Sequence, residues 1–366
     1  MKNLSLITFL IFACSAFGQT PTLEELLQKA EQGHAEPQFN MYALPPSVAK
    51  DEAEAAEWCR KAAEQGDANA QFNLGIMYFK GQGVAKDEAE AVKWWRKAAE
   101  QGDAGAQYNL GAMYAGGRGV TKDDAEAAKW CRKAAEQGNV RSQFILGRIY
   151  SKGQGVPKDE TEAAEWFRKA AEQGLVNAQV TLGTMYALGR GVPRDWAEAV
   201  KWFGKAAEQG DASAQYLLGA MHADGQGVAK DAVVAANWFR KAAEQGNVNA
   251  QNRLGFMYAK GEGVTKDETE ALNWWRKAAE QGNATAQNNL GVMYANGRGV
   301  AKNVTEAVKW YRKAAEQGHA NAQYLLGMGC LYGRGVKRDK AEAKIWLNKS
   351  AAQGNERAAA ALKSLK

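Results

Sequence analysis

The chain has 366 residues, of which 46% are hydrophobic and 24% are charged, and these are the proportions of an ordinary soluble folded protein. Its formal net charge of +6 is mild, and most of the basic residues belong to an Arg-Lys pair that recurs beside glutamates. Nucleic-acid binding favours Lys and Arg clustered on one face, so we expect no nucleic-acid partner.

The N-terminus has the features of an export signal. Lys2 is followed by an apolar run from Leu4 to Ala13 and by the small-residue site Ala16-Phe17-Gly18. This order predicts a signal peptide over residues 1–18, and the run is shorter than the roughly 20 apolar residues that span a membrane. An alternative interpretation makes Cys14 a lipid anchor, although Phe12 is bulky where a small residue is usual. We expect an exported protein, periplasmic or secreted.

A period of 36 residues organises the rest of the chain and overrides the two or three domains that its length would suggest. We expect an N-terminal capping helix over residues 19–33, and a degenerate first repeat over residues 34–66 that carries Pro45 and Pro46. Eight full repeats follow over residues 67–354, and residues 355–366 form a C-terminal capping helix. The full repeats begin at Asp67, Asp103, Asn139, Leu175, Asp211, Asn247, Asn283 and His319.

Each repeat contains the signals of two helices, as the repeat Asp67–Gly102 shows. Asp67 is expected to cap a first helix from Ala68 to about Lys80, which ends at a left-handed glycine, Gly81. Asp87 and Glu90 have the spacing of a capping box for a second helix that runs to Gln101. The apolar residues Ala91, Trp94, Trp95 and Ala98 then share one face of that helix.

Four groups of residues recur through the full repeats, and in Asp67–Gly102 they are Leu74-Gly75-x-x-Tyr78, Gly81-x-Gly83-Val84, Ala91-x-x-Trp94 and Lys97-Ala98-Ala99-x-x-Gly102. They resemble the Sel1-like repeat, a relative of the tetratricopeptide repeat. The resemblance implies an all-α fold, a right-handed α-solenoid of antiparallel helix pairs. It also implies a scaffold or receptor for other proteins, of a kind often bacterial and exported, whose first helices line the concave surface.

The repeated residues favour structural roles over chemistry. The Gly-x-Gly-Val loops follow helices, so they are interpreted as helix caps and not as phosphate loops. The helix glycine at Gly75 predicts close helix packing, and the tryptophan stripe that begins at Trp94 is interpreted as core. Cys59 and Cys131 lie two repeats apart, roughly 40 Å, whereas a disulfide needs Cα atoms within about 7 Å. We therefore expect free, buried thiols.

No catalytic, cofactor or metal site is predicted. His34, His222 and His319 fall in different repeats, so no histidine pair has metal-ligand spacing. His222 with Asp224 is the one local pair that would suit an enzyme. The cysteine-rich exported branch of the family is linked to β-lactam binding, but this chain lacks the paired cysteines of that branch.

The candidate site is the side of the first helices that differs from repeat to repeat. Asn side chains there can bond an extended peptide backbone, and Lys or Arg can hold carboxylates. We expect a monomeric, non-enzymatic adaptor of the cell envelope that binds a protein or extended peptide. Two alternatives are a cell-wall-fragment or β-lactam binding or hydrolysing protein, and a secreted factor that engages host proteins. The predicted partner-binding residues are Asn73, Lys80, Asn109, Arg141, Arg148, Lys152, Thr181, Arg253, Phe256, Lys260, Asn289 and Asn296.

Overall fold

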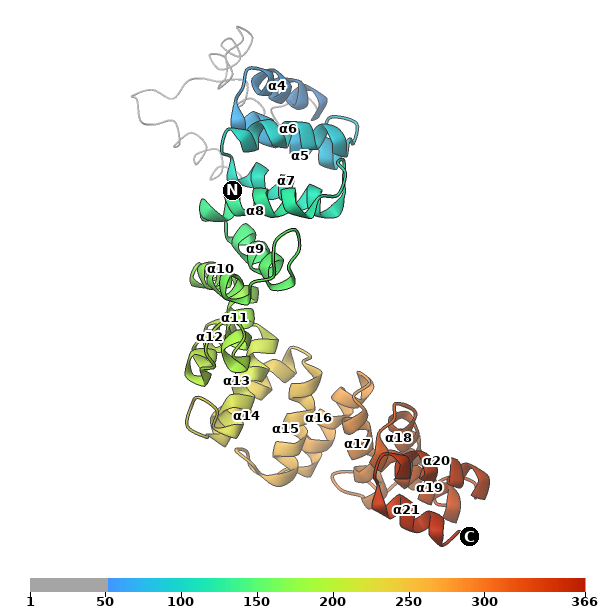
Figure 1. Cartoon of the computed structure of the whole chain (residues 1–366). Coiled ribbons are helices and arrows are strands. Elements are labelled where there is room, and N and C mark those ends of the chain that lie inside the picture. Colours follow the sequence, from blue (N-terminus) through green and yellow to red (C-terminus); the bar gives the residue numbers. More distant parts are fainter. Residues whose placement is uncertain (1–51, 366) are drawn as a thin grey trace, which may run out of the picture. The chain divides into compact units, whose positions relative to one another are not determined.

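The computed structural model describes residues 52–365, and in this range the chain is built of α-helices without strands. It divides into two compact units, unit 1 ending at Leu175 and unit 2 beginning at Val176. Within each unit the helices follow one another in chain order (Figure 1). The predicted α-solenoid of antiparallel helix pairs is confirmed. The predicted signal peptide and N-terminal capping helix, with residues 34–51 of the degenerate repeat, lie outside the described residues.

The helices of unit 1 are α4 (Glu52–Glu64), α5 (Ala68–Lys80), α6 (Glu88–Glu100), α7 (Ala104–Gly116), α8 (Asp124–Glu136), α9 (Val140–Lys152) and α10 (Glu160–Glu172). Those of unit 2 are α11 (Val176–Leu188), α12 (Trp196–Glu208), α13 (Ala212–Asp224), α14 (Ala232–Glu244), α15 (Val248–Lys260), α16 (Glu268–Glu280), α17 (Ala284–Asn296), α18 (Val304–Glu316), α19 (Ala320–Tyr332), α20 (Lys340–Ala352) and α21 (Glu356–Lys363). None of the helices in the described range is long and apolar enough to cross a membrane.

The ends of the first helices are as predicted. Asp67 Oδ1 accepts a hydrogen bond from the amide of Ala70 at 2.7 Å and so satisfies one of the free N–H groups at the start of α5. Gly81 ends the helix in the left-handed conformation, with φ 74°, and its amide donates to the carbonyl of Met77. A glycine is favoured there because a Cβ disfavours positive φ.

The second helices start differently from the predicted capping box. Asp87 does cap α6, since its carboxylate accepts from the amides of Ala89 and Glu90. The amide of Asp87, however, donates to the carbonyl of Tyr78, so the Glu90 side chain does not cap it. In the equivalent position, Glu126 accepts from the indole Nε1 of Trp130 at 3.0 Å. In several repeats the acidic residue therefore accepts a hydrogen bond from the tryptophan and does not cap the helix. The amide that it was expected to cap already donates to a carbonyl of the preceding helix.

Glycines allow the helices to approach closely. A Cβ on Gly75 would lie 2.5 Å from the ring of Trp95, which confirms the predicted close packing inside the repeat. Gly83 has φ +65°, and a Cβ there would lie 2.0 Å from the carbonyl oxygen of Glu52 in the preceding repeat. Gly83 thus allows its loop to touch the start of α4.

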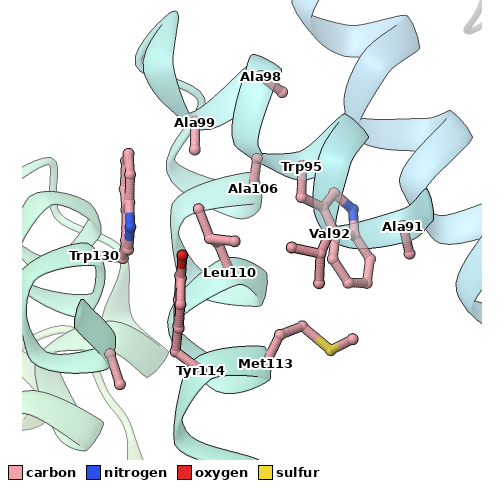
Figure 2. Close-up of a cluster of buried hydrophobic side chains, with 11 residues drawn as sticks. Ala91, Val92, Trp95, Ala98, Ala99, Ala106, Leu110, Met113, Tyr114 and Trp130 are labelled. Atoms are coloured by element: carbon pink, nitrogen blue, oxygen red, sulfur yellow. The ribbon is translucent and has the colours of Figure 1, made fainter. Parts of the chain in front are cut away.

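The core runs between successive helices, as one cluster of unit 1 shows (Figure 2). Leu110 and Met113 from α7 lie between Trp95 of α6 and Trp130 of α8, and all four are buried. Within a unit, a first helix such as α7 or α15 therefore shares its apolar side chains with the helix before it and the helix after it. This sharing is why the fold needs several repeats to bury its apolar surface.

A ladder of glutamine hydrogen bonds joins the repeats. Gln101 Nε2 donates to Gln71 Oε1 at 2.7 Å, and Gln71 Nε2 donates to the carbonyl of Ala63 in the preceding repeat at 3.0 Å. The same pair of bonds recurs in other repeats, for example from Gln281 to Gln251 and on to Ala243. The inner glutamine of each full repeat is buried and 3–4% exposed. The ladder satisfies these buried amides and fixes how neighbouring repeats meet.

Candidate functional site

The predicted site residues all lie on the helices from α5 to α17 that open a repeat. We call the side of the first helices α5, α7, α9, α11, α13, α15, α17 and α19 that carries these residues the first-helix surface. Exposed members are Lys80, Arg141, Arg148, Lys152, Arg253, Lys260 and Asn296, whereas Asn73, Asn109, Thr181, Phe256 and Asn289 are partly buried.

A hollow of about 620 Å³ on this surface in unit 1 brings three of the predicted residues together. Lys80 comes from α5, Asn109 from α7 and Arg141 from α9, so three successive first helices contribute. We call this the unit 1 hollow. Its complete lining is Phe72, Ile76, Phe79, Lys80, Trp95, Gly105, Tyr108, Asn109, Ala112, Met113, Arg118, Asn139, Val140 and Arg141.

Aromatic rings form the apolar part of the unit 1 hollow. Trp95 Nε1 donates to the carbonyl of Phe72 at 3.1 Å, and the rings of Phe79 and Trp95 pack with centroids 5.5 Å apart. The guanidinium of Arg118 lies 4.7 Å from the ring centroid of Phe79. These contacts hold the rings in one arrangement, which would lower the entropy cost of binding a ligand there.

The charges around the unit 1 hollow are positive. Arg118 forms an ion pair with Glu88, and this hydrogen-bonded contact holds the pKa of Glu88 below its usual value. Lys80 and Arg141 form no ion pair within residues 52–365, and the lining includes neither Asp nor Glu. The hollow therefore offers two unneutralised cations beside an apolar floor.

A second hollow, of about 550 Å³, lies on the same surface in unit 2 and includes the predicted residues Arg253, Phe256 and Lys260. We call this the unit 2 hollow. Asp224 and Glu262 also line it, and Lys260 Nζ lies 3.5 Å from Glu262 Oε1. The cations here are thus partly neutralised. Phe256 packs edge-on against Trp275 with centroids 5.2 Å apart, so its truncation would also remove a structural contact.

The other predicted residues lie outside both hollows. Thr181 Oγ1 donates to the carbonyl of Asn177 at 2.7 Å, and Asn296 Nδ2 donates to the carbonyl of Val292 at 3.0 Å. Their polar groups therefore bond to their own helices. Arg148 and Lys152 are exposed on α9 but line neither hollow.

Comparison with known families and structures identifies the architecture. The Sel1 repeat model matches residues 40–67, 68–103, 104–139, 140–175, 176–211, 212–247, 248–283, 284–319 and 320–355. The chain belongs to the Sel1 repeat family. Sel1 repeats form solenoid scaffolds that typically serve protein interaction, and their members are generally non-catalytic. The confirmed resemblance therefore supports a scaffold with a protein partner.

Two solved structures are similar along most of the chain. One is a protective antigen present in uropathogenic Escherichia coli strains, with 40% identity and a TM-score of 0.81 over 92% of this chain and 81% of the antigen. The other is a Sel1 repeat protein from Oxalobacter formigenes, with 37% identity and a TM-score of 0.68 over 90% of this chain and 94% of that protein. A comparison with curated proteins found no significant match.

The structure reveals a row of Sel1 repeat residues that the sequence-based prediction missed. With the N-cap residue counted as position 1, the sixth position of the repeat is occupied by Phe72, Tyr108, Phe144, Val180, Tyr216, Asn252, Asn288 and Tyr324. Phe72 and Tyr108 line the unit 1 hollow. The sequence-based prediction did not count this position among the partner-binding residues, since it is usually apolar. The asparagines at this position in two successive repeats, Asn252 and Asn288, were the sequence signal that could have identified the position as part of the surface.

The tryptophan that recurs in the repeats is part of the core and the cysteines are free and buried, as predicted. The ring of Trp94 is 9% exposed, and the ammonium of Lys97 covers it at 4.0 Å from the ring centroid, so no open stacking platform remains there. The three described cysteines, Cys59, Cys131 and Cys330, are free and buried. Burial raises the pKa of Cys59 and Cys131 to about 12, which disfavours the reactive thiolate.

The histidines do not assemble a reactive group in the described residues. His319 Nδ1 accepts from the amide of Ala322 at 3.2 Å and caps α19. His222 Nδ1 is buried without a hydrogen-bond partner, whereas Asp224 is exposed, and no bond joins the two side chains. No group of three or more His, Cys, Asp or Glu residues in residues 52–365 could hold a metal ion.

Proposed function

We propose that this Sel1 repeat protein is a non-enzymatic adaptor of the cell envelope that holds a protein or peptide partner on its first-helix surface. The observation that carries the proposal is the unit 1 hollow, where an aromatic floor meets Lys80 and Arg141, two cations that form no ion pair within the described residues. The 40% identity to a protective antigen present in uropathogenic Escherichia coli strains supports an exported protein. The predicted signal peptide over residues 1–18 supports export.

The chemistry of the hollow favours an apolar side chain with carboxylates beside it. A volume of about 620 Å³ lies within the range of roughly 300–1,000 Å³ typical of ligand pockets, so one or two large side chains fit. Burying one such side chain against the rings contributes about 1.5–3 kcal/mol. Carboxylates can then pair with Lys80 and Arg141, whereas a basic segment would be repelled. We therefore expect an acidic partner segment that carries an aromatic or long aliphatic residue.

Charge reversal in the hollow tests the proposal. The probe is a capped peptide with a phenylalanine flanked by glutamates, and its counterpart has lysines in place of the glutamates. We expect K80E/R141E to weaken binding of the acidic peptide at least tenfold, measured by fluorescence anisotropy, because two attractions become repulsions. The thermal midpoint should stay unchanged, since neither residue has an ion pair in the described chain.

A matched control carries the same change of net charge elsewhere. Lys344 on α20 and Arg357 on α21 are exposed and lie outside both hollows, so K344E/R357E should bind the acidic peptide as the wild type does. R148E/K152E should weaken binding less than K80E/R141E, because these side chains are on α9 but do not line the hollow. Equal binding by the wild type and K80E/R141E, with both folded, would contradict the proposed site.

A further inference from the structure

The unit 2 hollow and the unit 1 hollow are lined by equivalent positions of the repeat. Phe239 and Met257 of the unit 2 hollow stand four repeats after Trp95 and Met113 of the unit 1 hollow. All four side chains are buried and belong to the core. The differences between the two hollows therefore lie in the side chains around this shared apolar lining.

One corner of the unit 1 hollow is filled by side chains of the protein itself. The guanidinium of Arg118 lies 4.7 Å from the ring centroid of Phe79, and Arg118 Nε donates to Glu88 Oε2 at 3.4 Å. We call the repeat positions of Phe79, Glu88 and Arg118 the arginine corner. In unit 1 this corner already holds a cation beside a ring and a carboxylate.

In the unit 2 hollow the arginine corner has no arginine. The positions of the ring, the carboxylate and the guanidinium are taken by Ala223, Ala232 and Glu262, and all three residues line the hollow. Each alanine is smaller than the side chain at its position in unit 1. The corner therefore leaves room for a side chain of a ligand, and the carboxylate of Glu262 borders that room.

A second carboxylate lines the hollow next to this corner. Asp224 follows Ala223 on α13, is exposed, and forms no ion pair within residues 52–365, whereas unit 1 has Lys80 at the same position. Glu262 is paired with Lys260 at 3.5 Å, but exposed ion pairs of this kind contribute little to stability. A cation supplied by a ligand can therefore contact both carboxylates at small cost.

The hollow also offers cations that have lost their partner. In unit 1 the lysine equivalent to Lys230 pairs with an acidic residue two positions later, as Lys122 Nζ does with Asp124 Oδ2 at 3.3 Å. Ala232 removes that acidic residue from the unit 2 hollow. Lys230 and Arg253 thus line the hollow without an ion pair in the described part of the chain. The unit 2 hollow therefore presents unpaired groups of both signs.

We propose that the unit 2 hollow binds a peptide segment in which an arginine stands beside an acidic residue. The arginine side chain enters the arginine corner and pairs with Asp224 and Glu262, and the neighbouring carboxylate pairs with Arg253. This proposal rests on the proposed function and names a second determinant on the partner. It differs from the determinant of the unit 1 hollow, where the lining has cations alone.

The lining of the hollow favours this segment over simpler ligands. A purely acidic segment would be repelled by Asp224, and a purely basic one by Lys230 and Arg253. Arginine fits better than lysine, because its planar guanidinium pairs with carboxylates through two parallel hydrogen bonds and stacks on aromatic rings. The ring of Phe256 lines the hollow and is held edge-on against Trp275.

The probe is a fluorescein-labelled, capped peptide of glycine and alanine with one arginine beside one aspartate. Its counterpart has citrulline in place of the arginine, which keeps the shape and removes the charge. We expect the full wild-type chain to bind the arginine peptide at least tenfold more tightly than the citrulline peptide in fluorescence anisotropy. The difference should shrink at high salt, because the groups in the hollow are exposed to solvent.

Two variants test the site in the protein. D224N/E262Q removes both negative charges and keeps the shape, so it should weaken binding of the arginine peptide at least tenfold. A232E/E262R copies the pair of Glu268 and Arg298 in the next repeat and so places a cation of the chain itself in the arginine corner. It should also lose at least tenfold in affinity, while its thermal midpoint stays equal or rises slightly.

A matched control removes two negative charges elsewhere in unit 2. Glu208 on α12 and Glu244 on α14 are exposed, line neither hollow and form no ion pair in the described residues. E208Q/E244Q should therefore bind the arginine peptide as the wild type does. Circular dichroism of each variant shows whether it is folded.

Four results would overturn the inference. They are the absence of binding of the arginine peptide to the wild type, equal binding of the citrulline peptide, equal binding of the arginine peptide to the wild type and the two folded site variants, and a dimer of the free chain that D224N/E262Q dissociates. The dimer would assign the hollow to a second copy of the chain.

The acidic-peptide test of the unit 1 hollow uses another peptide and other variants. Failure of the arginine-peptide test therefore leaves the proposed function standing. Equal binding of the acidic peptide by the wild type and K80E/R141E would instead count against the proposed function.

Discussion

The first-helix surfaces of the two units have the same backbone but different chemistry. In unit 1, Phe72 and Tyr108 at the sixth position line a hollow whose cations Lys80 and Arg141 have no ion pair in the part of the chain that the structure describes. In unit 2, the sixth position on α15 is Asn252, and in the unit 2 hollow Lys260 of the same helix is paired with Glu262. The two hollows are similar in volume, about 620 and 550 Å³. Their side chains, and not their sizes, therefore set what each can bind.

This difference shows how a repeat fold separates stability from recognition. Residues such as Leu74 and Leu254 are fully buried at the same repeat position in both units. The side chain at the sixth position lies partly in the core and partly at the surface. Its replacement therefore leaves the residues that cap the helix unchanged. A single position can thus make one repeat aromatic and another polar within the same scaffold.

The largest expected effect is loss of both units at alkaline pH. Burial raises the pKa of Cys59 and Cys131 in unit 1 to about 12, from 9.0. In unit 2 it raises the pKa of Cys330 to about 11 and that of Tyr311 to about 12. The unfolded chain releases these protons at lower pH, so their contribution to stability is complete below pH 9 and is lost as pH rises towards 12. Circular dichroism across this range should show helix loss.

Substitutions of the buried titratable groups in each unit test which unit the loss of helix at high pH comes from. C59A/C131A should move the midpoint of the transition to higher pH through unit 1, and Y311F should do so through unit 2. Both thiols of unit 1 should also resist iodoacetamide at pH 8 in the folded chain and react after denaturation. Rapid alkylation of the native chain would contradict the burial of these thiols.

A smaller loss of stability is expected when Phe72, at the sixth position in unit 1, is replaced by the asparagine that unit 2 has at the same position in Asn252. F72N removes a partly buried ring that packs near Gly105, within 3.0 Å of the position that a Cβ on Gly105 would occupy. Truncation of a fully buried Phe costs about 3–5 kcal/mol, so we expect a loss of about 2 kcal/mol at this partly buried site. Hydrogen exchange of α5 and α7 should measure it, and acidic-peptide binding should fall because the floor loses a ring. Unchanged exchange and binding would show that the ring matters to neither.

The smallest expected effect concerns an arginine that both units have at the same repeat position, Arg118 and Arg298. Its replacement tests stability in both units and peptide binding in unit 1 alone. Arg118 pairs with Glu88 in unit 1, and Arg298 pairs with Glu268 in unit 2, 30 residues apart in each case. These pairs are exposed, so R118Q and R298Q should each lower the thermal midpoint only slightly, and less at high salt. R118Q alone should change acidic-peptide affinity, since Arg118 lies over Phe79 in the unit 1 hollow. Equal effects of the two variants on peptide binding would argue against a role for the hollow.

The helices were predictable because their start and stop signals are local. Asp67 and Gly81 act through bonds to residues three or four positions away, which sequence spacing captures. The role of Glu90 was not predictable in the same way. The amide that it was expected to cap is bonded to Tyr78 in the preceding helix, and that contact depends on how the two helices pack.

The candidate site was predictable only in part. Variation between repeats identified Lys80, Asn109 and Arg141, and the structure brings these three together. It did not distinguish them from Thr181 or Asn296, whose polar groups bond to their own helices. It also missed Phe72, because a residue that is partly core and partly surface has the same apolar pattern as one that is wholly buried. The proposed contacts themselves stay predictions.

The glutamine ladder has a consequence for how the length of this protein can change. Within a unit, an inner glutamine such as Gln251 reaches back eight residues to a carbonyl of the preceding repeat, and an outer glutamine such as Gln281 reaches back 30 residues to the inner one. Excision of Asp211–Gly246 would place the carbonyl of Ala207 where Gln251 now meets that of Ala243. Gene duplication or deletion by whole repeats therefore re-forms every junction, whereas insertion of one residue would leave a buried amide unpaired.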